Sequence, residues 1–447
     1  MTEERLSIRF SSQLPRLRDA VQQIDTRPVR GRVTKAVGTL IHAVVPNVRI
    51  GELCTIADAQ AGHAISAEVV GFTSKAVLLT PIGELHGLSM RSEVIPTGRT
   101  MTTPVGDNLL GRIIDSLGRA LDGGPPINRR ESVRPLHGPA PNPLSRQLID
   151  RPFNVGLRAV DGLLSCGEGQ RLGIYGEPGS GKSWLVAHIV KNADADVAVV
   201  GMIGERGREV REFIARQLGE EGLKRSVLVV ATSDKSPIER LKAAYVATAI
   251  AEHFRDSGRR VLLLIDSITR FARAAREIGL AAGEPPTRRG FPPSIFATLP
   301  QLIERAGMGE RGSVTAFYTV LVEGDGTGDP IAEETRGILD GHIVLSRTLA
   351  SSGHFPAIDV LASRSRLMEA VVSREHAIDA GRLRSLLARY AEIEFLIQVG
   401  EYKQGADKLA DEAVAKIGEL RSFLRQSPDE RTTFEETRRW MARLASQ

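Results

Sequence analysis

The sequence predicts an α/β protein, with a β-barrel before the α/β core and a helical region after it. Short β-branched runs, broken by Gly, Pro and Asn, fill residues 29–94. Apolar strand-like runs then alternate with helical stretches over residues 156–364, and the stretch beyond residue 368 is helical in pattern throughout. This order is typical of a small barrel followed by a parallel sheet covered by helices. We therefore expect three domains, over residues 1–97, 98–368 and 369–447.

The composition is that of an ordinary soluble globular protein. Of 447 residues, 42% are hydrophobic and 25% are charged, and the net charge of +5 does not by itself indicate nucleic-acid binding. The two cysteines, Cys54 and Cys166, lack the CxxC spacing of a zinc site and fit a reducing cytoplasm. The start of the chain lacks the apolar core of a signal peptide, and no apolar run reaches the roughly 20 residues that span a bilayer. We expect a cytoplasmic protein, and a peripheral position at a membrane stays open.

Residues 1–24 carry apolar side chains at helical spacing, at Leu14, Leu17, Val21 and Ile24. This spacing predicts a short amphipathic helix. Its polar face mixes both signs of charge, which favours packing on protein over binding to a membrane.

The amino-terminal β-branched runs predict a small barrel. They are "GRVTKAVGTLIHAVV", "CTIAD", "AEVVGF" and "KAVLLT". The first 98 residues contain only Phe10 and Phe72 as aromatic residues. Single-stranded nucleic acid is bound on aromatic stacking platforms, so this unit is not expected to bind RNA. Residues 95–130 are rich in Gly and Pro and are predicted to form a connector.

The core contains runs so continuously apolar that they suit strands buried on both faces of a parallel sheet. They are "RLGIYG", "VAVVGMIG", "SVLVVATS", "VLLLID", "SVTAFYTVL" and "HIVLS". Residues 283–300 hold five prolines, which predicts a structured loop because proline is excluded from helix interiors and central strands. Two apolar stripes, one from Leu383 to Ile397 and one from Leu409 to Leu424, predict the carboxyl-terminal helices.

A phosphate-binding loop lies between the first core strand and the helical run "SWLVAHIV". Gly176, Gly181, Lys182 and Ser183 match the P-loop pattern, in which backbone N–H groups surround phosphate oxygens. We expect Lys182 to act in catalysis at the β- and γ-phosphates, and the Ser183 hydroxyl to bind Mg²⁺ of a bound Mg–ATP. The residues expected to bind the nucleotide here are Gly176, Glu177, Pro178, Gly179, Ser180, Gly181, Lys182, Ser183 and Trp184. The sequence does not identify the apolar neighbours that an indole needs.

Two acidic residues follow other core strands. Asp266 ends "LLLID", where a carboxylate can hold a Mg²⁺-bound water. Glu205 follows "VAVVGMIG" and either polarises a water for attack on the γ-phosphate or forms a surface ion pair in "GERGREVRE". A basic side chain must also stabilise the transferring phosphoryl group, and these patterns do not select one.

A longer series of motifs resembles one family. The run "DSITRFARAAREIGLAAGEPPTRRGFPPSIFATLPQLIERAG" is similar to the signature of type III secretion ATPases, the injectisome and flagellar export branch of the rotary ATPases. "GMIGERGREVREFI", "TAFYTVLVEGDG", "ILDGHIVLSRTLA" and "HFPAIDVLASRSRLM" resemble the same family, over residues 28–425. The resemblance implies a P-loop core of the RecA-like kind.

The resemblance also implies roles for residues of the site. It makes Glu205 the catalytic carboxylate, supported by Arg206, which joins the catalytic set, and by Glu209. It places the metal-site aspartate at Asp266 and a supporting arginine at Arg270.

Two further roles follow from the same resemblance. Arg366 would be an arginine finger that reaches the neighbouring subunit's site, and Phe355 would face the adenine where relatives often have tyrosine. Because one chain then holds both the glutamate and the finger, a homohexamer with like sites is expected.

The function implied is ATP hydrolysis that releases secretion substrates from chaperones and unfolds them for export. The partners implied are a peripheral stalk or regulator protein at the amino-terminal parts, an export-gate membrane protein, and, at the carboxyl-terminal helices, a central stalk protein and chaperone–effector complexes. No nucleic-acid partner is expected. The place implied is the inner face of the cell membrane.

Three alternatives remain at this point. Pro178 favours an injectisome over a flagellar export ATPase, because flagellar members commonly have "SGVGKS". A ring helicase that translocates RNA or DNA shares the core but lacks support from the aromatic-poor barrel. Glu205 argues against a third alternative, a regulatory subunit that binds nucleotide without hydrolysis.

Overall fold

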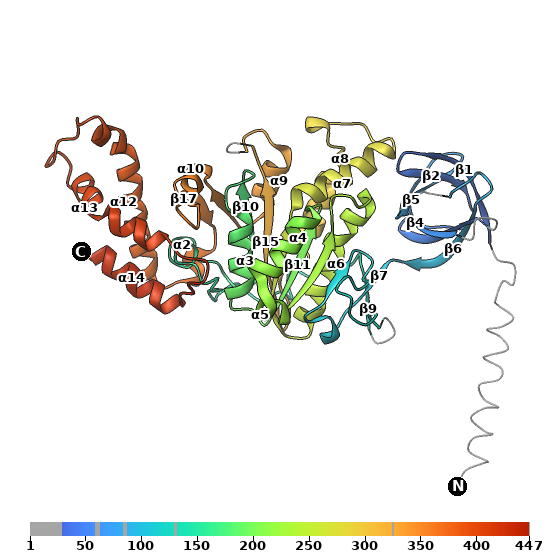
Figure 1. Cartoon of the computed structure of the whole chain (residues 1–447), viewed down its shortest axis with the longest axis horizontal. Coiled ribbons are helices and arrows are strands. Elements are labelled where there is room, and N and C mark those ends of the chain that lie inside the picture. The colour runs from blue at the N-terminus through green and yellow to red at the C-terminus, as the bar shows by residue number, and fades with distance from the viewer. Residues whose placement is uncertain (1–28, 59–62, 84–86, 129–131, 324–325, 447) are drawn as a thin grey trace, which may run out of the picture. The chain divides into compact units, whose positions relative to one another are not determined.

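The computed structural model describes residues 29–58, 63–83, 87–128, 132–323 and 326–446. The chain divides into two compact units, which meet in sequence between Thr100 and Met101 (Figure 1). The amphipathic helix predicted within residues 1–24 lies outside the described residues. The domain boundaries predicted at residues 97/98 and 368/369 stay predictions.

The first unit is a closed antiparallel barrel, with strand order β1-β2-β5-β4-β3-β6. Its side chains alternate between the interior and the surface, so that Ile41, Ala43, Cys54, Ile56 and Val69 fill a separate core. This confirms the predicted barrel. The strands are β1 Gly31–Val37, β2 Leu40–Val44, β3 Glu52–Asp58, β4 His63–Phe72, β5 Val77–Ile82 and β6 Glu93–Thr100.

The second unit is built on a nine-stranded sheet whose order is β17-β16-β10-β15-β13-β11-β12-β8, with β14 paired to β15. The strands from β16 to β8 run parallel, and β14 and β17 are antiparallel to their neighbours. The strands are β8 Ile113–Asp115, β10 Arg171–Gly176, β11 Val197–Ile203, β12 Ser226–Ala231, β13 Arg260–Asp266, β14 Gly307–Met308, β15 Ser313–Leu321, β16 Gly341–Leu345 and β17 Ile358–Ser365.

All six predicted core strands are present. The prediction of a simple connector over residues 95–130 is wrong, because this segment contributes β8, which pairs with β12 at the edge of the sheet. A stretch rich in Gly and Pro can still supply a short edge strand, where one side needs no partner.

Helices cover both faces of the sheet. Leu185 of α3 packs with Ala198, Val200 and Met202 of β11 on one face, whereas the residue between them, Gly201, faces Ala247 of α6 on the other. The segments beside α3 Lys182–Asn192 are α4 Gly207–Glu212, the π-helical η2 Phe213–Leu218 and α5 Gly219–Lys224. The series that begins with α6 is α6 Pro237–Asp256, α7 Ile268–Ala281, α8 Pro293–Ile303 and α9 Pro330–Ile338.

The predicted loop over residues 283–300 is wrong in its second half, which forms α8. Pro293 occupies the first helical position, where a missing N–H has no carbonyl partner to lose. Pro300 lies inside the helix, which ends three residues later at Ile303. The first half holds only the short turn η3 Arg288–Gly290.

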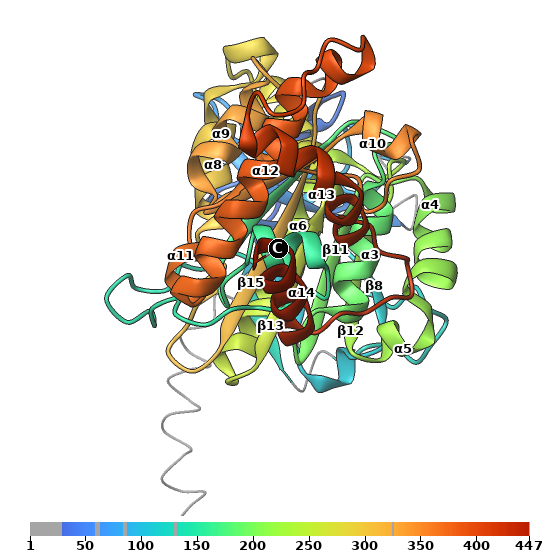
Figure 2. The same cartoon turned by 90° about the vertical axis from the view of Figure 1, so that its left-hand side faces the viewer.

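The carboxyl-terminal part is helical, as predicted, and comprises α12 Arg374–Gln398, α13 Lys408–Leu424 and α14 Phe434–Ser446. Figure 2 shows these helices lying side by side. Leu383, Leu386 and Phe423 belong to the same core cluster as Leu185 and Ile189 of α3. The helical part and the P-loop helix are therefore packed through one core.

The remaining short elements are β7 Thr102–Pro104, η1 Asp107–Leu109, β9 Val133–Pro135, α2 Arg158–Leu163, α10 Arg347–Ser351 and α11 Met368–Val371. Within the described ranges, no helix combines the length and the apolar character needed to cross a bilayer.

Candidate active site

The predicted phosphate loop connects the end of β10 to the start of α3. Gly179 and Gly181 have φ of +85° and +84°, a left-handed conformation that favours glycine. A Cβ on Gly176 would lie 2.5 Å from the Ser180 hydroxyl, so only glycine lets the loop close. Ser180 in turn donates from its hydroxyl to the Glu177 carbonyl oxygen over 2.7 Å. The loop is therefore held in shape by its own residues, with Pro178 exposed at its tip.

The structure brings Lys182, Glu205 and Asp266 together at the carboxyl edge of the sheet. The Lys182 ammonium lies 2.5 Å from an Asp266 carboxylate oxygen and 3.5 Å from a Glu205 oxygen. Arg270 of α7 contacts the other Glu205 oxygen over 3.3 Å. Thr319 of β15 donates to Asp266 over 2.7 Å. Three predicted residues on three different elements thus form one cluster.

The cluster is buried, and this perturbs its titration. Burial raises the pKa of the Glu205 carboxyl above its ordinary value, while the Lys182 ammonium opposes this rise. Burial alone would lower the pKa of Lys182, but Asp266 and Glu205 outweigh it, so that the pKa of Lys182 is raised. Lys182 therefore stays charged at neutral pH, and Glu205 holds a proton more readily than an ordinary glutamate does.

These residues fit a nucleotide with its metal ion. The backbone N–H groups at the start of α3 have no acidic residue in their first turn to compete with a phosphate. The Ser183 side chain is exposed in that turn, and Asp266 supplies a carboxylate. Hydroxyl and carboxylate oxygens are the donors that Mg²⁺ prefers beside substrate phosphates.

Glu209 touches the cluster through a side-chain hydrogen bond with Glu205, and Arg206 pairs with Glu209. The Arg206 side chain is 74% exposed and pairs with Glu209 over 2.9 Å at the start of α4. The predicted catalytic contribution of Arg206 stays a prediction.

Phe355 lies beside the phosphate loop: its ring carbon Cε1 would be 3.0 Å from a Cβ on Gly181. The Trp184 ring lies 6.3 Å from the Phe355 ring and stacks on His188 at 5.3 Å. Phe355, His188 and the core cluster against which Trp184 packs are therefore the neighbours of the indole that the sequence did not identify. His188 is four residues along the same helix, a spacing that could have pointed to the stacked pair.

Arg366 lies at the opposite edge of the sheet. Its backbone N–H donates to the Asp340 carbonyl oxygen, and the Asp340 N–H donates to the carbonyl oxygen of Arg171, the first residue of β10. The P-loop follows the last residue of the same strand, Gly176. The exposed Arg366 guanidinium donates to the Arg336 carbonyl oxygen over 3.0 Å. Through these contacts, Arg366 and the phosphate loop of one chain lie toward opposite ends of β10.

Two residues of the site were missed from the sequence. Thr319 is the Ser or Thr residue nearest the carboxyl end of the largely apolar strand β15, which is a usable signal. Gln426 donates from its backbone N–H to the Phe355 carbonyl oxygen over 2.9 Å, and no local pattern marks it because the contact joins distant parts of the chain.

Comparisons with known families match three consecutive segments. Residues 33–98 match the beta-barrel domain of the ATP synthase alpha/beta family, and residues 156–365 match its nucleotide-binding domain. Residues 372–443 match the T3SS EscN ATPase C-terminal domain.

Individual relatives cover nearly the whole chain. A type 3 secretion system ATPase of Sinorhizobium fredii is 67% identical over 95% of this chain and 94% of the relative. One of Xanthomonas euvesicatoria is 56% identical over 91% and 92%. A flagellum-specific ATP synthase of Pseudomonas aeruginosa is 48% identical over 98% and 97%.

Solved structures agree with this. The assembled ATPase EscN of the enteropathogenic E. coli type III secretion system has a TM-score of 0.88 and 46% identity, over 93% of this chain and all of that one. EscN in complex with its central stalk EscO has a TM-score of 0.86 and 45% identity, with the same coverage.

Proposed function

The chain belongs to the family of type 3 secretion system ATPases, and from this membership we propose that it hydrolyses ATP to release and unfold chaperone-bound substrates for export. It is an ATP-hydrolysing enzyme of type III secretion. The observation that carries the proposal is the buried cluster of Lys182, Glu205 and Asp266 beside the phosphate loop.

Each residue of the cluster and of the phosphate loop beside it has one role in this proposal. The loop N–H groups and Lys182 hold the phosphates and offset their charge. Ser183 and Asp266 hold Mg²⁺, which when bound neutralises charge on the β- and γ-phosphates. Glu205 orients the attacking water and takes up its proton, a role that a raised pKa suits. Arg270 keeps the Glu205 carboxylate turned toward the site through their 3.3 Å contact.

The site is completed by a second copy of the chain. The Arg366 backbone lies near the start of β10, whereas the P-loop of the same chain lies at the end of this strand. This separation supports a role for Arg366 as an arginine finger in the neighbouring subunit's site. A homohexamer with six like sites satisfies this requirement, and the similarity to assembled EscN supports it. Phe355 faces the base, with Trp184 behind it.

The partners and the location follow the same proposal. The similarity to EscN with its central stalk EscO supports a central stalk partner for this chain. A peripheral stalk or regulator protein at the barrel, an export-gate membrane protein and chaperone–effector complexes at α12–α14 complete the set. The chain then works at the cytoplasmic face of the cell membrane.

One biochemical experiment tests this proposal. Purified chain should hydrolyse ATP only with Mg²⁺, and Arg366→Ala should lose turnover by about 10³-fold while it still binds nucleotide. Hydrolysis by Arg366→Ala at the wild-type rate would refute the assignment of the finger.

The flagellar relative at 48% identity keeps a second candidate function, flagellar protein export. Deletion in the native organism, with effector secretion and swimming measured side by side, distinguishes the two. Lost swimming with intact secretion would overturn the injectisome assignment.

A further inference from the structure

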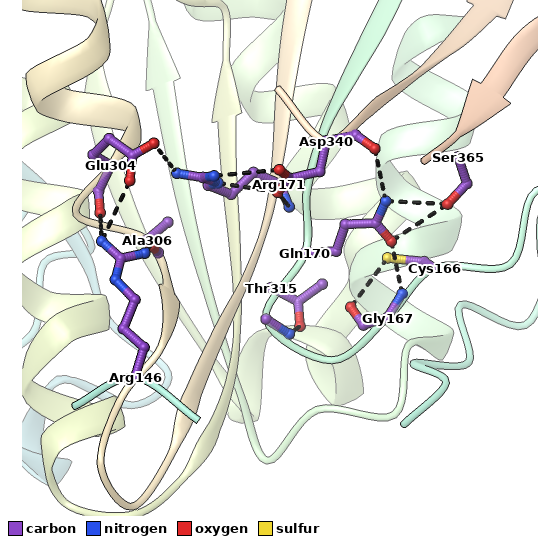
Figure 3. Close-up of polar contacts among 11 residues, drawn as sticks. Arg146, Cys166, Gly167, Gln170, Arg171, Glu304, Ala306, Thr315, Asp340 and Ser365 are labelled. Atoms are coloured by element: carbon purple, nitrogen blue, oxygen red, sulfur yellow. Dashed lines mark hydrogen bonds and ion pairs between the residues drawn. The ribbon is translucent and has the colours of Figure 1, made fainter. Parts of the chain in front are cut away.

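A partly buried polar network, shown in Figure 3, occupies the amino-terminal edge of the sheet. Arg171, the first residue of β10, donates from its backbone N–H and its Nε to Asp340 Oδ2 over 3.1 and 3.0 Å. Its guanidinium also contacts Glu304 over 2.5 Å. Asp340 and Glu304 together hold the pKa of Arg171 above its usual range even though burial works against this. Arg171 therefore stays charged in its contacts with Asp340 and Glu304.

The same network reaches the base of the arginine finger. The Asp340 carbonyl oxygen accepts the backbone N–H of Arg366 over 3.0 Å. The fully buried Gln170 donates from one nitrogen to that carbonyl oxygen over 3.0 Å and to the Ser365 hydroxyl over 3.1 Å. Figure 3 shows Gln170 between Asp340 and Ser365. The backbone from which the Arg366 side chain starts is thus fixed on two sides.

We propose that Asp340 and Gln170 are positioning residues for Arg366, which set the place and direction from which the finger enters the neighbouring site. This inference rests on the proposed function, in which Arg366 acts on a second copy of the chain.

The contrast between base and tip supports the proposal. The Arg366 guanidinium is exposed and donates only to the Arg336 carbonyl oxygen among the contacts of the described residues. A long side chain whose exposed tip makes a single hydrogen bond is aimed mainly by its base, and misplacement by about 1 Å can reduce turnover about 100-fold. Strand β10 also links the base of Arg366 to the P-loop of the same chain. Its first residue, Arg171, contacts Asp340, and the P-loop begins at its last residue, Gly176.

The competing explanation is that the Arg171–Asp340 ion pair only stabilises the fold. The chain contains a second ion pair at the start of a strand, Arg260–Asp196, which distinguishes the positioning role from the structural one. Arg260 begins β13 and donates from its backbone N–H to Asp196 over 2.8 Å and from its guanidinium over 3.0 Å. Asp196 returns its own N–H to the Arg260 carbonyl oxygen over 2.8 Å, as Asp340 does to Arg171 over 2.9 Å. Each arginine keeps a second carboxylate partner. Only the Asp340 pair contacts the finger.

The first experiment compares Asp340→Asn with Asp196→Asn in the full chain. Both changes remove one strand-start ion pair and should lower the thermal midpoint, and the drop should be larger in Asp340→Asn because its pair is less exposed (side chains 14% and 23% exposed, against 40% and 41%). Asp340→Asn should also lower kcat by about 10-fold or more, with the Kd of a fluorescent ADP analogue unchanged, whereas Asp196→Asn keeps kcat. Equal kcat in the two variants would overturn the proposal.

Ser365→Ala provides a second variant in case Asp340→Asn fails to fold. It removes the hydroxyl that accepts from Gln170 and that donates to the Ser165 carbonyl oxygen over 2.9 Å, without a change of charge. It should lower kcat in the same way with nucleotide affinity intact. Wild-type kcat in this variant would also count against the proposal.

The second experiment uses assemblies mixed from two defective chains. Lys182→Ala has a defective phosphate loop and an intact finger, so it should restore hydrolysis above the sum of the separate activities when co-assembled with Asp340→Asn. Asp340→Asn with Arg366→Ala should show no such gain, because both fingers are defective.

The control assembly is Arg366→Ala with Lys182→Ala. If this control shows no gain, action between subunits, and with it the proposed function of Arg366, is wrong. If the control gains activity but Asp340→Asn with Lys182→Ala does not, only the positioning role of Asp340 is wrong.

Discussion

Because we propose Glu205 as the base, we expect its surroundings to set how hydrolysis depends on pH. Burial raises the pKa of its carboxyl above the ordinary 4.5, and Lys182 and Arg270 oppose this rise. A base must be deprotonated, so kcat/KM should increase with pH along an acidic limb whose midpoint lies above 4.5.

Removal of the Arg270 charge should therefore shift the pH dependence of kcat/KM in a defined direction. In Arg270→Gln the opposing cation is gone, the pKa of Glu205 rises further, and the acidic limb moves to higher pH. The measurement is kcat/KM against pH for both proteins. A limb that stays in place or moves to lower pH would show that Arg270 does not act on Glu205.

The two left-handed glycines of the phosphate loop form a matched pair. A Cβ on Gly179 meets no atom within 4 Å, whereas one on Gly181 lies 3.0 Å from the Phe355 ring. Both alanine variants should suffer backbone strain of about 1–2 kcal/mol, and Gly181→Ala should in addition displace Phe355. We expect weaker nucleotide binding in both, with the larger loss in Gly181→Ala; titration with a fluorescent ADP analogue measures this. Equal losses would exclude a contribution from Phe355.

Among the helices, α9 depends on its N-cap residue, Asp329, which directly precedes the helix. Asp329 accepts the N–H groups of Ile331 and Ala332 over 2.8 and 3.0 Å, which caps the helix whose later residue Arg336 holds the Arg366 tip. Asp329→Ala should cost about 1 kcal/mol of stability, and Asp329→Ser should recover most of it because serine is also a good cap. Thermal unfolding of the two variants checks this, and equal midpoints would contradict it.

The strands of the core were predictable because burial on both faces requires a continuous apolar run. The strand β8 and the helix α8 were not predicted from the sequence. Residues 113–115 form the edge strand β8 although their surroundings are rich in Gly and Pro, because an edge strand depends on its neighbour β12 more than on its own pattern. The helix α8 tolerates two prolines, since Pro293 sits where no N–H is needed and Pro300 lies near the end.

The site was predictable where a motif carries it and not where distant parts of the chain meet. Lys182 follows from the P-loop pattern and Asp266 from its place at the end of an apolar strand, whereas the catalytic role of Glu205 was favoured only through the family resemblance. Gln170 and Asp340 could not be found, because their importance comes from hydrogen bonds to Ser365 and to the Arg366 backbone, far away in the sequence.

On the scale of the whole chain, the two units differ in how much they depend on their neighbours. The barrel has its own core, whereas α12 and α13 share a core with the P-loop helix. Each fully buried Leu or Phe contributes about 1.5–3 kcal/mol, so loss of Leu383, Leu386 and Phe423 removes much of a typical net stability of about 5–15 kcal/mol.

We therefore expect a chain that stops at residue 368 to lose cooperative unfolding, and a chain that starts at residue 101 to keep it. Circular dichroism during heating distinguishes the two. A sharp transition in the chain that ends at residue 368 would show that the shared core is dispensable.

The position of Trp184 has an experimental consequence. The chain has two tryptophans, and the other, Trp440, lies on α14 under the Arg158 guanidinium. In a Trp440→Phe protein all indole emission would come from the first turn of the P-loop helix, next to Phe355, the ring that we propose faces the base. Such a protein is its own optical reporter: the filling and emptying of each site during a catalytic cycle could be followed in real time, without any attached dye.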